Sequence, residues 1–127
     1  MRDVIVIGLG PAGSTAARIA SEQGLNVLGI DKAVFPRHKP CAAGLTARAC
    51  RLLPMHESEY LEQKVHSIRI YMGMNKHIDL TDSEPVMITS KRETLDTALL
   101  RRAIQVGTEV MEDCRVIIQH IHKQKRF

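Results

Sequence analysis

The sequence predicts an α/β fold in which a parallel sheet carries a small antiparallel insertion, and three observations predict it. The β-branched, wholly apolar run Val4 to Ile7 is typical of a parallel strand that is covered on both faces. A glycine turn, a helical segment at Ser14 to Gln23 and a second apolar strand at Asn26 to Ile30 follow, which together make one right-handed strand-helix-strand unit. From Val65 onward, short apolar runs separated by turn residues indicate antiparallel strands.

Length and composition are those of a single globular domain. The chain has 127 residues, of which 44% are hydrophobic and 25% charged, and its net charge is +4. Two Tyr, two Phe and no Trp offer little surface for stacking bases, so nucleic acid is not an expected partner. The cysteines Cys41, Cys50 and Cys114 form no CxxC pair, which favours a reducing compartment. The short apolar run near Met1 suits neither a signal peptide nor a membrane span, so we expect a cytoplasmic protein.

The first helix is expected to end at Gly24 and to bury a face of small apolar residues, namely Ala16, Ala17, Ile19 and Ala20. A long loop containing Pro36 and Pro40 then stands where the next helix of a simple α/β unit would begin. A short helix is expected at Leu45 to Leu53. The antiparallel strands are expected at Ser67 to Met72, Lys76 to Leu80 and Val86 to Thr89.

A second long helix follows the insertion. Ser90 and Glu93 have the spacing of a capping box, and the helix should end at Gly107. Its buried face is expected to contain Leu95, Leu99 and Ala103. Two more strands are expected at Glu109 to Glu112 and Val116 to Ile121.

The glycine turn has the pattern GxGxxG, which alone is weak evidence for a function. Here it follows a strand, opens a helix and is followed by Asp31 at the end of the second strand. Gly8 permits the tight turn, Gly10 lets the backbone approach a pyrophosphate, and Gly13 allows the helix to pack closely on the strand. The amides at the helix start would face phosphates, and Asp31 would accept hydrogen bonds from ribose hydroxyls. These features predict a Rossmann-like dinucleotide-binding domain.

The same turn serves NAD and FAD. In the plain nicotinamide arrangement a second helix follows the second strand at once, whereas this chain first has a long loop, a short helix and a β insertion. A bulky flavin ring could lie against that loop. The sequence therefore favours FAD, with NAD as the alternative.

Four segments together carry a family resemblance: VIVIGLGPAGSTAA, the acidic Asp31, FPRHKPCAAGLT and KRETLDTALLRRAIQVGTEV. They resemble the amino-terminal FAD-binding part of the geranylgeranyl reductase family, within a larger group that includes the aromatic hydroxylases. The loop Phe-Pro-Arg-x-Lys-Pro-Cys is the most specific of the four. The resemblance implies a Rossmann-like FAD-binding domain with a parallel sheet and a small antiparallel β insertion.

The resemblance also implies individual cofactor contacts. Ala12 and Asp31 match the pyrophosphate and ribose contacts, and Arg92 matches an arginine that reaches back to the cofactor; a solvated charge beside Lys91 is the alternative for Arg92. Val116 falls where backbone groups read the adenine edge.

The proline loop supplies the contacts beside the flavin. Cys41, Ala42 and Gly44 match this loop, although Ala42 and Ala43 stand where the family more often has glycines, and their methyl groups could restrict approach of the ring. Arg37, His38 and Lys39 could lower the pKa of the Cys41 thiol, but contact with the cofactor is expected rather than catalysis. The expected cofactor-binding residues are Gly8, Gly10, Pro11, Ala12, Gly13, Asp31, Lys32, Arg37, Cys41, Ala42, Gly44, Arg92 and Val116.

By resemblance the complete protein is an oxidoreductase that reduces carbon-carbon double bonds of isoprenoid chains. Such a substrate would allow peripheral contact with a membrane, and no transmembrane segment is expected. Alternatives are an aromatic-ring hydroxylase, a quinone-linked flavoprotein dehydrogenase, and a non-catalytic FAD-binding fragment. The family continues into a second flavin-binding segment with Gly-Asp and a substrate domain, so residues 1–127 are expected to be a partial FAD-binding domain without the substrate domain. No catalytic residue is assigned.

A metal site is not expected. His120 and His122 form an H-x-H pair, but no third ligand has a matching spacing. Cys50 and Cys114 are expected to be packed thiols.

Overall fold

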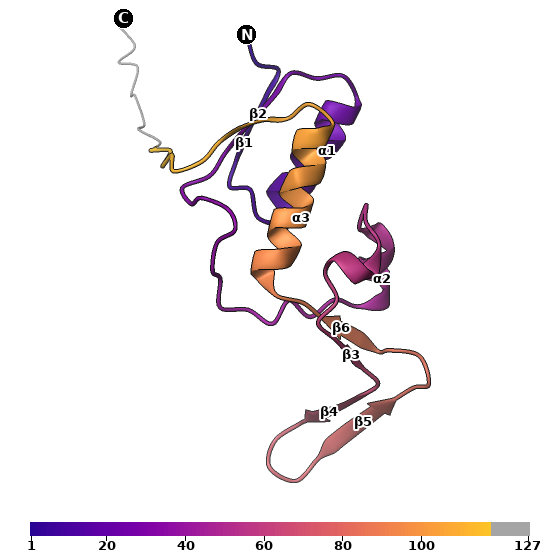
Figure 1. The fold of residues 1–127 in the computed structure, drawn as a ribbon. Coiled ribbons are helices and arrows are strands. Elements are labelled where there is room, and N and C mark those ends of the chain that lie inside the picture. Colours follow the sequence, from indigo (N-terminus) through magenta and orange to yellow (C-terminus); the bar gives the residue numbers. More distant parts are fainter. Residues whose placement is uncertain (118–127) are drawn as a thin grey trace, which may run out of the picture.

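The computed structural model describes residues 1–117 and contains a three-stranded parallel sheet with two long helices beside it (Figure 1). The strands are β1 (Val4–Ile7), β2 (Val27–Ile30) and β7 (Glu109–Met111), in the order β1-β2-β7. The helices are α1 (Pro11–Glu22) and α3 (Arg92–Gln105). The predicted strand-helix-strand unit and the parallel sheet are therefore confirmed.

The two helices pack on one face of the sheet. Ala17 of α1, Val27 of β2 and Ala103 of α3 form a buried cluster against which Val4 and Val6 pack. The opposite face is open in the described part of the chain, where Ile5 and Ile7 are 57% and 58% exposed. The prediction that Val4 to Ile7 is covered on both faces is therefore wrong for residues 1–117, because α1 and α3 both pack on the face that contains Val4 and Val6.

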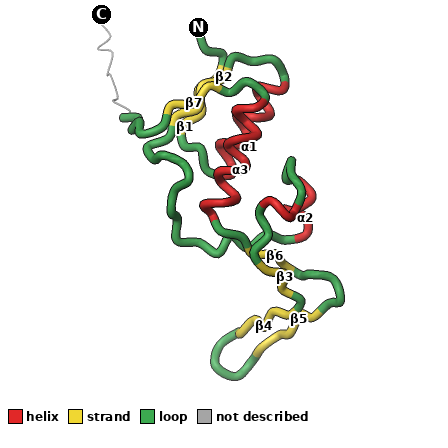
Figure 2. The backbone as a smooth tube through the Cα atoms, in the orientation of Figure 1, coloured by secondary structure: helices red, strands yellow, loops and turns green. Residues whose placement is uncertain are grey.

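The antiparallel insertion leaves the sheet and helices as an extension (Figure 2). It begins with α2 (Ala47–Leu52) and a 3-10 turn η1 (Glu57–Glu59). The strands form two separate pairs, β3 (Gln63–Val65) with β6 (Met87–Thr89), and β4 (Ser67–Tyr71) with β5 (His77–Thr81). The predicted insertion is confirmed, but β3 precedes the first expected strand, which begins at Ser67, since the exposed Gln63 and Lys64 give no apolar alternation.

Two predicted details of the helices are wrong. The helix α3 starts at Arg92 with Lys91 as its N-cap and no side-chain cap among the described residues, and the Ser90 hydroxyl instead donates to the Lys91 carbonyl. In α1, Ala16 and Ile19 are exposed, whereas the buried positions are Ser14, Ala17 and Ser21.

Close packing of α1 explains its buried serines. The Ser14 hydroxyl donates to the Leu9 carbonyl at 2.8 Å, and Ser21 and Thr108 share a hydroxyl hydrogen bond of 2.8 Å. Small hydroxyls of this kind can be buried because each has a partner. The predicted buried face of α3, Leu95, Leu99 and Ala103, is confirmed.

The final predicted strand is only partly within the described residues. Val116 and Ile117 are not in a strand, and residues 118–121 lie outside the description, as do His120 and His122. The backbone nevertheless returns to the sheet, because the Cys114 amide donates to the Asp31 carbonyl at 2.9 Å.

Candidate functional site

The glycine turn connects β1 to α1 at the carboxyl end of the parallel sheet. Gly8 has a φ of +88°, a conformation that glycine adopts readily, and its amide donates to the Ile30 carbonyl at 2.7 Å. A Cβ on Gly13 would lie 1.8 Å from the Gly8 carbonyl oxygen. The role predicted for Gly13, close packing of helix on strand, is therefore visible in the structure.

The first turn of α1 carries donors suited to an anion. Gly10 is the N-cap, and among the described residues no side chain caps this helix start. Pro11 has no N–H, so the Ala12 and Gly13 amides are the donors left at the N-terminus. With the positive end of the helix dipole behind them, these amides fit a phosphate group.

Asp31 stands at the end of β2 and is only 7% exposed. One carboxylate oxygen accepts a hydrogen bond from the Leu9 amide at 2.6 Å, and the other accepts from the Ala33 amide at 2.9 Å. Asp31 therefore holds the glycine turn against β2, a structural task that the sequence analysis did not identify. Its remaining lone pairs stay available for ribose hydroxyls.

Three pockets follow one another along this edge. The first, of about 540 Å³, includes the glycine turn, Asp31, Lys32 and Arg37. A second, of about 240 Å³, shares Gly8, Asp31 and Lys32 with it and reaches Val116. A third, of about 340 Å³, shares residues His38 to Pro40 with the first and contains Cys41, Ala42 and Arg92. This arrangement suits an elongated ligand that crosses the glycine turn.

Almost all the predicted cofactor-binding residues line this series of pockets. They come from the turn after β1, the first turn of α1, the residues directly after β2, the proline loop, the start of α3 and the segment after β7. The exception is Gly44, which lines none of the three: a Cβ there would lie 2.8 Å from the Met87 sulfur, so this glycine permits close approach to β6.

Arg92 is held inside the site rather than solvated. Its guanidinium donates to both oxygens of Asp96, at 2.8 and 2.9 Å, and this carboxylate raises the pKa of Arg92. Arg37 approaches the same carboxylate at 3.0 Å and stacks over the Phe35 ring. The solvated alternative for Arg92 is therefore wrong.

Asp96 was missed in the sequence analysis. The only signal in the sequence was its four-residue spacing from Arg92 on a helix. That spacing predicts an exposed pair as readily as a buried one.

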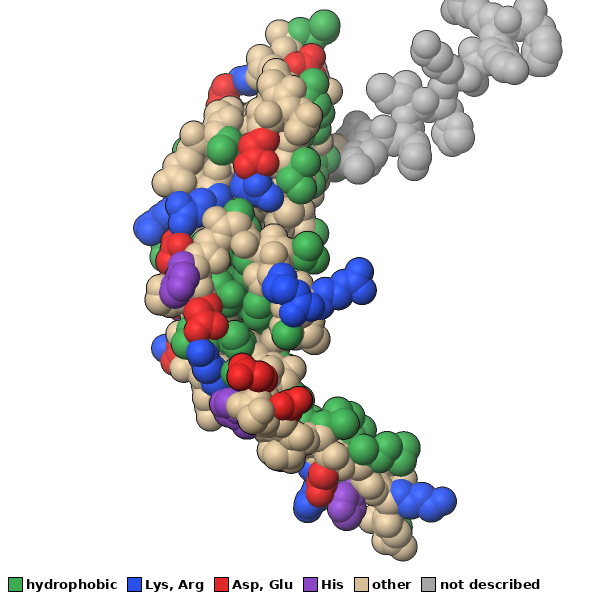
Figure 3. Space-filling model, turned by 90° about the vertical axis from the view of Figure 1, so that its right-hand side faces the viewer, with side chains coloured by type: hydrophobic (Ala, Val, Ile, Leu, Met, Phe, Trp, Pro, Cys, Tyr) green, Lys and Arg blue, Asp and Glu red, His purple; other side chains and the backbone are tan. Residues whose placement is uncertain are grey.

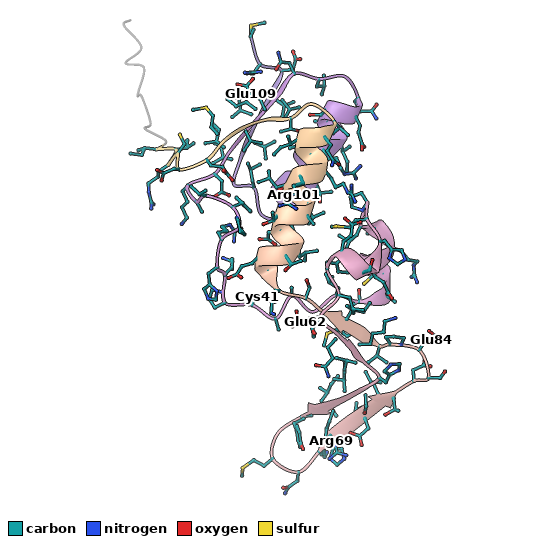
Figure 4. The ribbon with its side chains drawn as sticks, in the orientation of Figure 1. Cys41, Glu62, Arg69, Glu84, Arg101 and Glu109 are labelled. Atoms are coloured by element: carbon teal, nitrogen blue, oxygen red, sulfur yellow. The ribbon has the colours of Figure 1, made fainter. Side chains whose placement is uncertain are left out.

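Cys41 lies in the loop beside the first turn of α3 (Figure 4). Its sulfur accepts a hydrogen bond from the Ala43 amide at 3.4 Å. This bond, and next a hydrogen bond with Arg92, lower the pKa of the exposed Cys41 thiol. The sequence pointed instead to Arg37, His38 and Lys39 as the cause.

The two alanines of the loop have different surroundings. Ala42 is exposed in the third pocket, whereas Ala43 is 7% exposed and belongs to the core cluster that contains Tyr60, Ile88 and Leu99. The Ala43 methyl therefore points into the protein and does not restrict the pocket. Of the two methyl groups that the sequence raised as obstacles, only that of Ala42 faces the site.

A larger hollow of about 650 Å³ lies on the outer face of α3, away from the glycine turn. Its walls carry both signs of charge, including Glu59 and Arg102, which pair at 2.7 Å. Pocket size alone does not identify a functional site. No helix in residues 1–117 is long and apolar enough to cross a membrane.

A strand, glycine turn and helix, with an acidic residue at the end of the second strand, define a dinucleotide-binding α/β domain. The family described as "FAD binding domain" matches residues 1–125, and the chain belongs to this family. FAD is accordingly its cofactor, as predicted. The uncapped amides of Ala12 and Gly13, and the guanidinium groups of Arg37 and Arg92 beside Gly10, are donors that fit the diphosphate of FAD.

Named reductases are among the similar proteins. The chain is 32% identical over 122 residues to a menaquinone reductase of Mycolicibacterium smegmatis, covering 91% of this chain and 30% of that protein. It is 33% identical over 110 residues to digeranylgeranylglycerophospholipid reductase 2 of Methanopyrus kandleri, covering 85% and 27%. The chain thus spans about 30% of the length of these relatives.

Solved structures agree with this assignment. A geranylgeranyl bacteriochlorophyll reductase-like protein from Thermoplasma acidophilum superposes with a TM-score of 0.77 at 30% identity, covering 88% of this chain and 30% of that one. Halogenase PltM in complex with phloroglucinol and FAD superposes with a TM-score of 0.71 at 18% identity, which shows the fold alone. The resemblance to the amino-terminal part of the geranylgeranyl reductases is confirmed.

Proposed function

We propose that this chain binds FAD as the amino-terminal part of an oxidoreductase of the geranylgeranyl reductase type, which in complete form reduces carbon-carbon double bonds of isoprenoid chains. The observation that carries the proposal is the continuous series of pockets from Val116 across the glycine turn to Cys41. An extended dinucleotide has the shape and the chemical groups that this series accommodates.

Each pocket has a task in the proposal. The pocket at Val116 would take the adenine, and Asp31 would hold the ribose. The amides of Ala12 and Gly13, with Arg37 and Arg92, would bind the diphosphate. The loop at Cys41 and Ala42 would lie beside the flavin.

When bound, FAD supplies a two-electron carrier that accepts and delivers hydride. The chain's own residues fix its position: the glycine turn and the arginines hold the phosphates, and the proline loop forms one wall. The relatives named for reduction of lipid-type molecules support an isoprenoid substrate for the complete protein.

The first experiment is a titration of FAD with the purified chain. We expect quenching of flavin fluorescence and retention of the yellow colour on gel filtration. A chain that is folded by circular dichroism and leaves FAD fluorescence unchanged would exclude the proposal for these residues.

The variant Asp31→Asn separates two roles of this residue. The amide oxygen can still accept the Leu9 hydrogen bond that holds the turn, whereas the hydrogen bond from the Ala33 amide and the charged acceptor for the ribose are lost. We expect FAD affinity to fall by about tenfold, the loss of roughly one hydrogen bond to a charged group. An unchanged affinity would disprove the ribose role.

A quinone-linked enzyme is the second candidate. A stretch of 47 residues is 62% identical to a menaquinone reductase of Mycobacterium tuberculosis, covering 37% of this chain and 12% of that protein. The genomic sequence downstream of Phe127 tests whether a Gly-Asp segment and a substrate domain follow. Mass spectrometry of products from a complete protein then separates addition of two hydrogens from insertion of oxygen, which an aromatic hydroxylase would cause.

A further inference from the structure

Asp96 is a completely buried carboxylate that binds two arginines from different parts of the chain. Arg92 precedes it by one turn of α3, and Arg37 comes from the proline loop. The side chains of Arg92 and Arg37 are themselves only 13% and 16% exposed. A carboxylate buried to this extent requires such partners, because an unpaired buried charge is strongly unfavourable.

The two guanidinium groups meet at the glycine turn. A Cβ placed on Gly10 would lie 3.3 Å from Nη2 of Arg37 and 3.8 Å from Nη2 of Arg92. Gly10 is also the N-cap of α1, where the helix amides begin. Both arginines therefore stand beside the same position as the donors that fit a phosphate.

The pairing leaves binding capacity in the arginines. Asp96 occupies Nε and Nη2 of Arg92, which leaves Nη1 outside this bidentate bond. Arg37 contacts Asp96 through Nη2, and its guanidinium carbon lies over the Phe35 ring at 4.9 Å from the ring centroid. Two cations and one anion give the cluster an excess positive charge, which attracts a phosphate.

A purely structural ion pair would not need this arrangement. An i, i+4 pair within α3 would be complete with Arg92 alone. The second arginine ties the proline loop to α3 and brings a second cation to Gly10.

We propose that Asp96 is a positioning residue, which sets the orientation of Arg37 and Arg92 so that they bind the diphosphate of the dinucleotide. This inference rests on the proposed function, since the diphosphate belongs to FAD. Asp96 touches the arginines and not the ligand.

The sign of its effect distinguishes positioning from simple charge. Asp96 carries a negative charge beside an anion site, so by charge alone its neutralisation would tighten the binding of a diphosphate. Positioning predicts the opposite, because unheld arginines lose their alignment.

The test measures dissociation constants for ADP and adenosine, by displacement of FAD from the chain. The two probes share the adenine and ribose and differ in the diphosphate. In Asp96→Asn we expect the preference for ADP over adenosine to fall by about tenfold, while adenosine affinity stays within roughly twofold. A preference that is unchanged or increased, or an equal loss for both probes, would overturn the proposal.

Glu93→Gln is the matched control. Glu93 is an exposed acid on the same helix and pairs with His38 at 3.2 Å rather than with the two arginines. Its neutralisation should leave the ADP preference unchanged or slightly raised. A loss equal to that of Asp96→Asn would mean that any nearby charge has this effect, and would refute the positioning role.

A second variant covers the case in which Asp96→Asn does not fold. Asp96→Glu keeps the charge but moves the carboxylate by one methylene, so the arginines shift relative to Gly10. We expect the ADP preference to fall by at least about threefold, and an unchanged preference in a folded Asp96→Glu would overturn the inference. If the wild-type chain itself does not bind FAD, the proposed function fails, whereas binding with an unaltered preference in the variants refutes Asp96 alone.

Discussion

The substitution Gly13→Ala gives the most direct test of the glycine turn. Gly13 lies in the first turn of α1, where alanine would ordinarily stabilise a helix by about 1 kcal/mol relative to glycine. Here the new Cβ would lie 1.8 Å from the Gly8 carbonyl oxygen and 2.9 Å from the Gly8 carbonyl carbon. Non-bonded atoms prefer a separation of about 3.5 Å, so the backbone of the turn would have to move by roughly 1.7 Å.

Such a clash with backbone cannot be relieved by a side-chain rotation. Overpacking of this kind costs about 3 kcal/mol or more, which exceeds the gain in helix propensity. The expected net loss of at least about 2 kcal/mol lowers the Tm by roughly 8 °C for a domain of this size. Thermal unfolding followed by far-ultraviolet circular dichroism measures it.

Gly10→Ala is the matched control for this experiment. Gly10 has a φ of −67°, which alanine adopts, and its Cβ would lie 3.3 Å from Nη2 of Arg37 and 3.8 Å from Nη2 of Arg92, which are side-chain ends and not backbone. We expect a stability loss below about 1 kcal/mol together with weaker FAD binding. If Gly13→Ala were as stable as the wild type or more stable, the close packing deduced for the turn would be wrong.

Three further predictions concern the core and the titrating groups. Leu99→Ala should lower the free energy of unfolding, measured in urea, by about 2–5 kcal/mol, because Leu99 is 1% exposed in the core cluster. Ile104→Ala, at an exposed site of the same helix, should lower it by less than about 1 kcal/mol. Equal losses in the two variants would contradict the packing. Burial, and next a hydrogen bond with Cys50, raise the pKa of Tyr60 from 10.0 to about 12. The unfolded chain therefore releases this proton first, so stability should fall between pH 10 and 12, and Tyr60→Phe should flatten that fall; an identical pH profile would refute it. Because the pKa of Cys41 is lowered, iodoacetamide should alkylate the Cys41 thiol of the folded chain at a lower pH than that of the chain unfolded in urea. Arg92→Gln should shift the pH profile of this alkylation to higher pH, and an unshifted profile would exclude Arg92 as a cause. Mass mapping, with Cys41→Ser as the control, identifies the alkylated cysteine.

The hairpin β4-β5 shows which features of the fold a local residue pattern can predict. Its strands alternate, so that Ile68 pairs with Leu80 and Ile70 with Ile78 on one face, and Arg69 pairs with Asp79 on the other. Apolar side chains gather on this hairpin in the space-filling view (Figure 3). The strands were predictable from this alternation, whereas their separation from the β3-β6 pair was not, because strand pairing depends on long-range contacts.

The site was predictable to a similar extent. The fingerprint at Gly8 to Gly13 and the acid Asp31 were found from spacing, because each glycine answers a local backbone requirement. Ser90 and Glu93 had an equally regular spacing, yet neither caps the helix, since the N-cap is Lys91, one residue later than that spacing predicts. Residue spacing is therefore a sound guide only where the predicted secondary structure on both sides of the motif also fits it, as it does for the glycine turn.

The sequence by itself determined the strand, the glycine turn and the helical face of α3, because these depend on backbone conformation and on periodicity within a few residues. Only the tertiary structure decided that Ala43 points into the core, that Asp31 binds the Leu9 amide, and that Arg37 and Arg92 meet on Asp96. The physical reason is that burial and ion pairing join residues distant in sequence, whose meeting follows from how the helices and loops pack.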